Sequence, residues 1–375
     1  MKKILFLNGE YSYTVDIIRV LKNNKKNITI HVLIKQKSYR CRSKYIDVFH
    51  FLPDNQNIVE FIHFLDKKHT FDMIFPVGIP EVEIFSREKE KFKNIYVDDF
   101  DIVAKTIFKS ETLKIANNLG IPTPKSIVIH SRREIQDLEK YDFHLPLFVK
   151  SYKETEKRIR NVAKKRKHLM ELCNEIFHTG CKPLIQEFIS DPFTYGVGIY
   201  AEQGKIIKYF IHKEVLSYPP TGGGGVILTT FNDERLIFYT EKLIDFLKYS
   251  GFALVEFKYD SRLEDYVLME INAKLWASIA FALPAIGDFF PFMSTNDDLS
   301  EDHIYLFPDR LILTFRYSPF KAAKWFFHFL FFKGKRKINF NKKDLKYEIC
   351  KIFISFRLYI PSFIKKRIKK TFLYS

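Results

Sequence analysis

Two acidic residues and one asparagine form the most informative chemical pattern in the sequence. The segment GFALVEFKYD sets Glu256 among alternating apolar residues, and YVLMEIN does the same for Glu270 and Asn272. Such alternation predicts two half-buried strands joined by a short turn. If both apolar sets are buried on one side, Glu256 pairs with Glu270 and Asn272 lies one step along the same face. A slip of one residue would expose one of the apolar sets.

Two carboxylates and a carboxamide oxygen on one face are a donor set that suits Mg²⁺. This ion commonly takes one or two carboxylates together with phosphate oxygens and water. The alternative is the polar, solvent-facing side of an ordinary hairpin. Two acids placed opposite each other repel unless a cation compensates them, and this favours the metal site.

The hairpin, GFALVEFKYD followed by RLEDYVLMEINAKLWASI, resembles the closing metal-binding motif of the ATP-grasp superfamily. The likeness is to carboxylate-amine ligases of the type of the carbamoyl-phosphate synthetase large chain. It implies that Glu256, Glu270 and Asn272 hold the magnesium ions that bridge the phosphates of ATP, with Mn²⁺ as an alternative metal. The family arginine two residues after the asparagine is here Lys274, and the proline between them is Ala273. Lysine keeps the charge but not the bidentate geometry.

Three upstream segments resemble the ATP-contacting segments of the same family, in the same order. KSETLKIANNLGIPTP and LPLFVKSY each match a segment whose lysine reaches the phosphates, which implies that role for Lys109 and Lys150. Two ammonium groups would offset much of the charge of a triphosphate. PLIQEFI resembles the hinge that contacts adenine and ribose. The implied hinge residues are Gln186, Glu187, Phe188 and Ile189.

A glycine run at 222–225 precedes a predicted strand. Consecutive glycines let backbone N–H groups approach an anion closely, and the alternative is a plain hairpin loop. The family has a glycine-containing loop here, near the acyl phosphate, so Gly223, Gly224 and Lys274 are the catalytic candidates.

Two segments depart from the family pattern. Where the family has a small glycine-rich lid, residues 153–167 are a run of lysines and arginines without glycine. That run is either a basic clamp for phosphates or a solvated helix face. Where the family often has a pair of arginines, the sequence has His212, Lys213 and Glu214. The resemblance therefore defines the ATP and metal sites better than the acceptor site.

The activity that the resemblance implies is an ATP-dependent ligase that joins a carboxylate to an amine through an acyl phosphate. One alternative is a relative that phosphorylates bicarbonate or carbamate. Another is a non-enzymatic adaptor for a membrane or a nucleic acid on a decayed scaffold, although every acidic metal position is retained. The expected small-molecule partners are ATP, a carboxylate and an amine.

The chain is expected to consist of four segments. Residues 1–100 alternate short apolar runs with helical stretches, and the runs at 4–7, 28–34, 71–77 and 94–97 are predicted strands. This pattern predicts a parallel sheet in an α/β domain that precedes the ATP-grasp domain. Residues 101–182 and 183–300 read as the two α+β subdomains of an ATP-grasp fold. A polar, basic helical stretch is expected before Phe177, and residues 301–375 are expected to be a basic, helical tail.

The C-terminal tail carries most of the charge. Residues 306–375 contain eighteen Lys or Arg against three acids, and so hold +15 of the net charge of +17. Aromatic and aliphatic residues between these cations predict interfacial helices on an anionic membrane. On this hypothesis, truncation near Phe307 leaves the catalytic body intact and still able to bind Mg-ATP. The alternatives are docking on the enzyme body or a homodimer contact, and nucleic acid ranks third because no base-stacking platform is visible.

The four scattered cysteines suit a reducing compartment, and no CxxC pair or histidine cluster indicates zinc. The apolar run after Met1 ends at Asn8, too early for a secretory core. We therefore expect a cytoplasmic protein, with peripheral attachment to the inner face of the membrane as an extension of the tail hypothesis.

Overall fold

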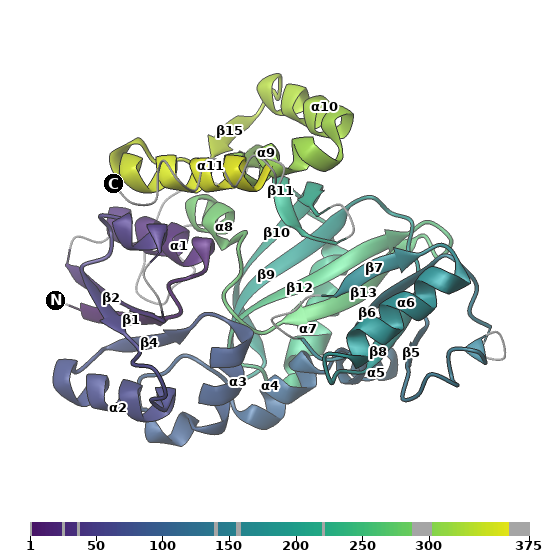
Figure 1. The fold of residues 1–375 in the computed structure, drawn as a ribbon, viewed down its shortest axis with the longest axis horizontal. Helices are drawn as coiled ribbons and strands as arrows, with labels where there is room; N and C mark the ends of the chain where they lie inside the picture. The colour runs from purple at the N-terminus through teal and green to yellow at the C-terminus, as the bar shows by residue number, and fades with distance from the viewer. Residues whose placement is uncertain are drawn as a thin grey trace.

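Three β-sheets organise the chain in the computed structural model, which describes residues 2–24, 27–35, 38–138, 142–154, 159–219, 222–286 and 302–359. Figure 1 shows the N-terminal sheet on one side, a small sheet with its helix on the other, and a long sheet between them. Among the described residues no helix combines the length and the apolar character needed to cross a membrane.

The N-terminal sheet is parallel throughout, with strand order β3-β2-β1-β4. Its strands are β1 (Lys2–Leu7), β2 (Ile28–Ile34), β3 (Val48–Phe51) and β4 (Met73–Pro76). Helix α1 (Ser12–Asn24) lies above the sheet in Figure 1, and α2 (Ile58–His69) and α3 (Ile79–Arg87) lie below it. Because helices cover both faces, consecutive residues of β1 from Ile4 to Leu7 are all fully buried. The predicted parallel α/β sheet is confirmed.

Two details of this region differ from the prediction. Strand β3 was not foreseen, and residues 94–97, predicted as a strand, form only an isolated bridge from Ile74 to Ile95. Both differences depend on strand pairing. A short apolar run forms a strand only where another strand lies beside it to share hydrogen bonds, and the local sequence does not show this.

The small sheet is antiparallel, with order β5-β8-β6-β7, and α6 (Arg166–Phe177) packs on it. Its strands are β5 (Ser126–Val128), β6 (Leu147–Ser151), β7 (Arg160–Ala163) and β8 (Pro183–Glu187). The helices α4 (Phe100–Ile107) and α5 (Lys109–Asn118) precede it. The expectation of a helical stretch through Phe177 is wrong in its first part, because residues 160–163 pair with β6 as a strand and the helix begins only at Arg166.

The long sheet has seven strands in the order β13-β12-β9-β10-β11-β14-β15. Its first five in sequence are β9 (Thr194–Glu202), β10 (Lys205–Tyr218), β11 (Gly224–Thr230), β12 (Gly251–Asp260) and β13 (Asp265–Asn272). Helix α7 (Glu234–Leu247), capped by the Asp233 side chain, packs on β9 and β10. Side chains of this sheet, of α8 (Ile279–Ile286) and of β1 and β2 share one apolar core.

The C-terminal region extends this sheet rather than forming a separate appendage. Strand β14 (His303–Leu306) pairs with β11, and β15 (Lys335–Ile338) pairs with β14. The helices α9 (Pro308–Tyr317), α10 (Pro319–Leu330) and α11 (Leu345–Tyr359) lie along the top of the molecule in Figure 1. A helical C-terminal region was expected, but its two strands were not. The expectation that truncation near Phe307 leaves the body intact is wrong, because the removed residues include part of the core.

A buried polar network ties α11 to the N-terminal domain. The Arg19 guanidinium of α1 lies 2.9 Å from Glu348, which in turn lies 2.9 Å from the Lys351 ammonium. At the start of the helix, Ser43 donates to Asp344 over 2.6 Å. Glu348 is fully buried, and a buried charge is tolerated only with such partners. The C-terminal region is therefore part of the folded body.

Replacing Glu348 by Ala tests this network. The change leaves the Arg19 and Lys351 charges buried without their shared partner, so we expect the free energy of unfolding to fall by about 3–5 kcal/mol. Urea unfolding followed by circular dichroism measures it. The control is Glu175→Ala on the exposed side of α6, which should change the free energy by no more than about 0.5 kcal/mol. Equal stability of the two variants would contradict the structural role given to α11.

Candidate active site

The three predicted metal ligands meet on the hairpin of β12 and β13. Glu256 stands opposite Glu270, as the apolar alternation predicted, and Leu254 stands opposite Asn272. A bulge follows Glu256 and shifts the register of the remaining pairs. The Asn272 amide nitrogen donates to Glu256 over 2.8 Å and to Glu270 over 3.3 Å. The predicted register is confirmed, and it concentrates two carboxylates at one point of the sheet.

Two lysines from other elements lie against one of these carboxylates. Lys109 begins α5 and Lys150 lies on β6, yet their ammonium nitrogens are 3.6 Å and 3.5 Å from the same oxygen of Glu270. Both lysines are buried. The structure thus brings together five of the residues that the sequence had singled out from three separate segments.

The two carboxylates differ in their electrostatic surroundings. Burial, together with the charge of Glu270, raises the pKa of Glu256 well above its usual range. Burial alone would also raise the pKa of Glu270, but Lys109 and Lys150 lower it well below that range. Burial lowers the pKa of Lys150 to about 8. In its ionised form Glu256 therefore lacks a compensating cation among the described residues, and a bound metal ion would supply one.

The donor set around Glu256 fits a hard divalent ion only if other ligands complete it. Among the described residues no group of three or more His, Cys, Asp or Glu could hold a metal. Two carboxylates and one amide, each giving one oxygen, leave about half of an octahedron open, which suits Mg²⁺ when substrate phosphates and water supply the rest. The Asn272 amide would have to present its oxygen to the ion in place of its NH₂ group.

An acidic residue that the sequence reasoning missed lies among the lysines. The Glu154 carboxylate contacts the Lys109 ammonium directly and lies 3.9 Å from that of Lys274. Lys274 is itself buried and follows Asn272 by two residues. A single Glu in a basic run gives no sequence signal for this role, because the bridge between Phe108 and Lys153 decides which side chain meets Lys109.

A cavity of about 640 Å³ opens over this cluster. Its walls come from the loop after β1, from β6, β7 and β10, and from the hairpin. The predicted site residues that line it are Lys150, Gly223, Gly224, Glu256, Glu270, Asn272 and Lys274. Apolar walls are supplied by Phe148, Leu254, Met269 and Trp276. A volume of this size accommodates a nucleotide-sized ligand.

The glycine loop lines the cavity, but its amides are partly engaged within the protein. The N–H of Gly223 donates to the Pro219 carbonyl over 2.8 Å, and that of Gly225 donates to Glu214 over 3.1 Å. A Cβ at Gly223 would lie 1.8 Å from the Tyr218 carbonyl oxygen, so no other residue fits. The glycine run thus serves a tight turn first, and the catalytic role of Gly223 and Gly224 stays a prediction.

Two arginines that the sequence analysis had not singled out also line the cavity. Arg160 comes from β7, in the basic run where the family has its glycine-rich lid. Arg310 comes from α9 and donates to the Gly225 carbonyl over 2.6 Å, with its guanidinium 4.3 Å from the centre of the Phe307 ring. The C-terminal region therefore contributes to the site, which is a second reason why the boundary near Phe307 was misjudged.

The predicted adenine hinge is placed differently from the other site residues. None of Gln186, Glu187, Phe188 and Ile189 lines the cavity. The Gln186 amide donates to Ser126 over 2.8 Å, and the Glu187 carboxylate contacts Arg262. Near the acceptor side, Glu214 lines the cavity while His212 is buried beside Ser278. Nucleotide contacts by the hinge stay a prediction.

The arrangement of the three sheets around this cavity is the ATP-grasp fold, as the sequence motifs indicated. The biotin carboxylase domain of the Hydrogenobacter thermophilus 2-oxoglutarate carboxylase, solved with MgADP, ADP and bicarbonate, superposes with a TM-score of 0.62 and 15% identity over 77% of this chain and 67% of its own. An L-amino acid ligase from Bacillus licheniformis superposes with a TM-score of 0.60 and 15% identity, over 77% and 72%.

A relative is also found by sequence. A D-aspartate ligase of Enterococcus faecium is 22% identical over 231 residues, which is 56% of this chain and 54% of that ligase. The match therefore spans about half the length of the relative. No family model matches the sequence. At these identities the comparisons establish the fold.

Replacing Glu256 by Gln tests the metal assignment. The change keeps the shape and removes the carboxylate that lacks a cation, so the melting temperature without metal should stay the same or rise. Nucleotide turnover, measured as ADP release with Mg²⁺, should fall by about 100-fold or more. The control is Glu264→Gln in the exposed turn of the same hairpin, which should change neither quantity. Near-normal turnover in the Glu256 variant would show that this carboxylate does not hold the metal.

Proposed function

We propose that this protein is a Mg-ATP-dependent ligase that activates a carboxylate as an acyl phosphate and couples it to an amine. The observation that carries the proposal is the meeting of Glu256, Glu270 and Asn272 with buried lysines at the wall of one nucleotide-sized cavity. Paired acids with partial cationic compensation are an arrangement that costs stability unless a ligand completes it. A polyphosphate with its metal is such a ligand.

In the proposed reaction a substrate carboxylate oxygen attacks the γ-phosphorus of ATP. The bond from that phosphorus to the β,γ-bridging oxygen breaks, and ADP leaves. The amine nitrogen then attacks the acyl carbon, the carbon–oxygen bond to phosphate breaks, and the amine loses a proton as phosphate departs. Lys150 would hold phosphate oxygens in place, and Lys274 and Arg160 lie where they can bind the transferred group. Lys109 does not line the cavity, so its contact with phosphate rests on the family resemblance alone.

Glu256, Glu270 and Asn272 would hold the metal ion. When bound, Mg²⁺ neutralises phosphate charge during transfer, and Mn²⁺, which also accepts oxygen ligands, is the alternative. In its absence the Asn272 amide donates to both carboxylates and so bridges them.

The acceptor that we propose first is an amino acid. Two of the compared proteins are named as ligases of amino acids, one of D-aspartate and one of L-amino acids. The third was solved with bicarbonate, so a bicarbonate-phosphorylating activity is the second candidate. Glu214 on the cavity wall offers a carboxylate to an ammonium group, and Arg310 offers a guanidinium to a carboxylate, a combination that suits an amino acid.

Mg-ADP and Mg-ATP should stabilise the protein against heat. Ligand at about a hundred times its dissociation constant adds about 2.7 kcal/mol, measured as a rise in melting temperature. Lys150→Met removes a buried ammonium that faces the cavity and should abolish most of the rise. Lys114→Met, on the exposed side of α5, should leave it intact. No shift at millimolar Mg-ATP would refute the proposed nucleotide site.

Release of ADP should require both co-substrates. Pools of carboxylic acids are offered with D-aspartate, with other D- and L-amino acids, or with bicarbonate alone, and product masses are read directly. We expect ADP release together with a product whose mass equals acid plus amine minus water. Release with bicarbonate alone would favour the second candidate. Nucleotide binding without any release would oppose both activities.

A further inference from the structure

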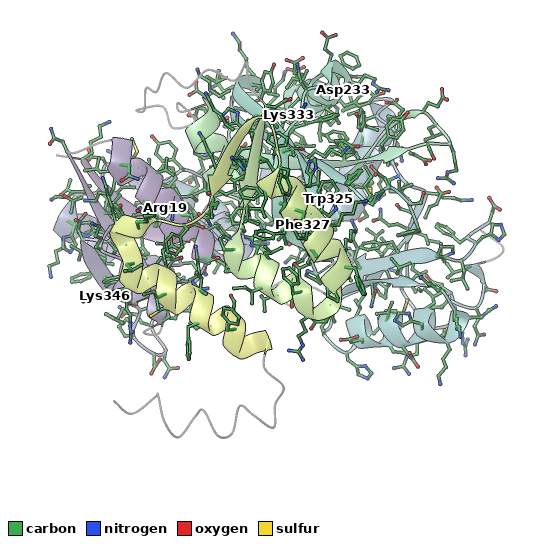
Figure 2. The ribbon with its side chains drawn as sticks, turned by 90° about the horizontal axis from the view of Figure 1, so that it is seen from above. Arg19, Asp233, Trp325, Phe327, Lys333 and Lys346 are labelled. Atoms are coloured by element: carbon green, nitrogen blue, oxygen red, sulfur yellow. The ribbon has the colours of Figure 1, made fainter. Side chains whose placement is uncertain are left out.

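The outer face of the C-terminal region exposes apolar side chains together with basic side chains. We propose that this face binds the surface of an anionic phospholipid bilayer. The face is made by α9, α10, β15 and α11, which lie together at one end of the molecule in Figure 1 and are seen from outside in Figure 2. The inference does not depend on the ligase activity.

Helix α11 is amphipathic, but its polar side faces the protein and its apolar side faces solvent. Its inner face buries Glu348, Lys351 and Ser355, whereas its outer face exposes an apolar stripe. The stripe follows helical spacing, and its members are Leu345, Ile349, Phe353 and Phe356. Turning the helix to bury this stripe would break the ion pair of Arg19 with Glu348 and strand buried charges. The polar network therefore fixes the apolar stripe outward.

Exposed apolar side chains are concentrated in this region. More than half of the large apolar residues exposed among the described residues lie between Tyr317 and Phe356, within forty residues. Phe320 at the start of α10 is 90% exposed, and Phe331 just after its end is 79% exposed. Scattered exposed apolar residues need no explanation, but an aromatic cluster on one face marks an interaction site.

The charges of this face have one sign. Between residues 308 and 356 the acids are Asp309, which is half-buried, and Asp344 and Glu348, which are buried and paired. The exposed cations of this segment are Arg316, Lys321, Lys324, Lys333, Lys335, Arg336, Lys342, Lys343 and Lys346. Arg42 and Lys44, exposed beside the start of α11, extend the basic area. Figure 2 shows Lys346, Phe327 and Lys333 spread across the face.

This combination suits a lipid surface better than two other occupants. A symmetric contact with a second copy would set the same basic face against itself, and like charges would oppose it. A nucleic acid would match the cations and could stack bases on the exposed phenylalanines, but it offers no apolar environment to the aliphatic Leu330, Ile338, Leu345 and Ile349. An anionic bilayer accepts both features, since aromatic and aliphatic groups enter the headgroup boundary while cations meet the lipid phosphates.

The test is sedimentation of the full chain with vesicles of phosphatidylcholine containing about 30% phosphatidylserine. We expect binding to these vesicles, at least tenfold weaker binding to phosphatidylcholine alone, and weakening by salt because exposed charges are screened. Lys346→Gln should lower the partition coefficient about fivefold.

Three variants with matched exposure sharpen this test. Phe327→Glu and Ile349→Glu, at positions that are 57% and 55% exposed, should each reduce binding tenfold or more without changing the melting temperature. Phe64→Glu, at a 55% exposed position on α2 at the opposite end of the molecule, should leave binding unchanged.

Several outcomes would overturn the proposal. One is equal binding to neutral vesicles, and another is an equal loss of binding in the Phe64 variant. A third is a dimer in analytical ultracentrifugation that Ile349→Glu dissociates, with no vesicle binding by the wild-type protein. A fourth is salt-sensitive binding of single-stranded DNA in place of vesicles.

Discussion

The site depends on one electrostatic constraint, the burial of two carboxylates side by side. Glu256 and Glu270 repel each other, and Asn272 alone cannot compensate two charges. The lysines that do so come from α5 and β6, so these elements must pack against the hairpin. The compensation is one-sided, because both ammonium groups lie against Glu270. Within the described part of the chain Glu256 has no such partner, so the raised pKa of its carboxyl favours the protonated form until a cation with a polyphosphate enters the cavity and stabilises the carboxylate.

The long sheet places much of the wall of that cavity. Its strands β12 and β13 carry the acids, β10 and β11 carry Glu214 and the glycine turn, and β14 leads into α9 with Arg310. The apolar core beneath it continues into the N-terminal sheet and includes Tyr347 of α11. The N-terminal and C-terminal regions are therefore parts of one body around the site, and each supplies a cavity-lining residue, Arg40 and Arg310.

The C-terminal region has an inner side with buried charged groups and an outer side with exposed apolar groups. Its inner side satisfies charges that would otherwise be buried alone, as in the ion pairs of Glu348 with Arg19 and Lys351. Its outer side leaves aromatic residues in contact with solvent. The first feature stabilises the body and at the same time fixes the orientation of the second. The same helix α11 thus links folding of the enzyme to the surface that we propose for lipid.

The hairpin register and the parallel N-terminal sheet could be predicted from the sequence, because alternation and apolar runs are local properties of the chain. The resemblance to family motifs singled out Lys109 and Lys150, but as phosphate contacts and not as partners of Glu270. Which distant residues meet at the site depends on long-range packing. Glu154, Arg160 and Arg310 had no pattern of their own, β14 and β15 became strands because β11 offered an edge, and the hinge at Gln186 lies outside the cavity. Helix α11, whose apolar side faces solvent, is the clearest case. Helical spacing reveals an apolar stripe but cannot tell whether it faces inward, and here the buried ion pairs decide that it does not.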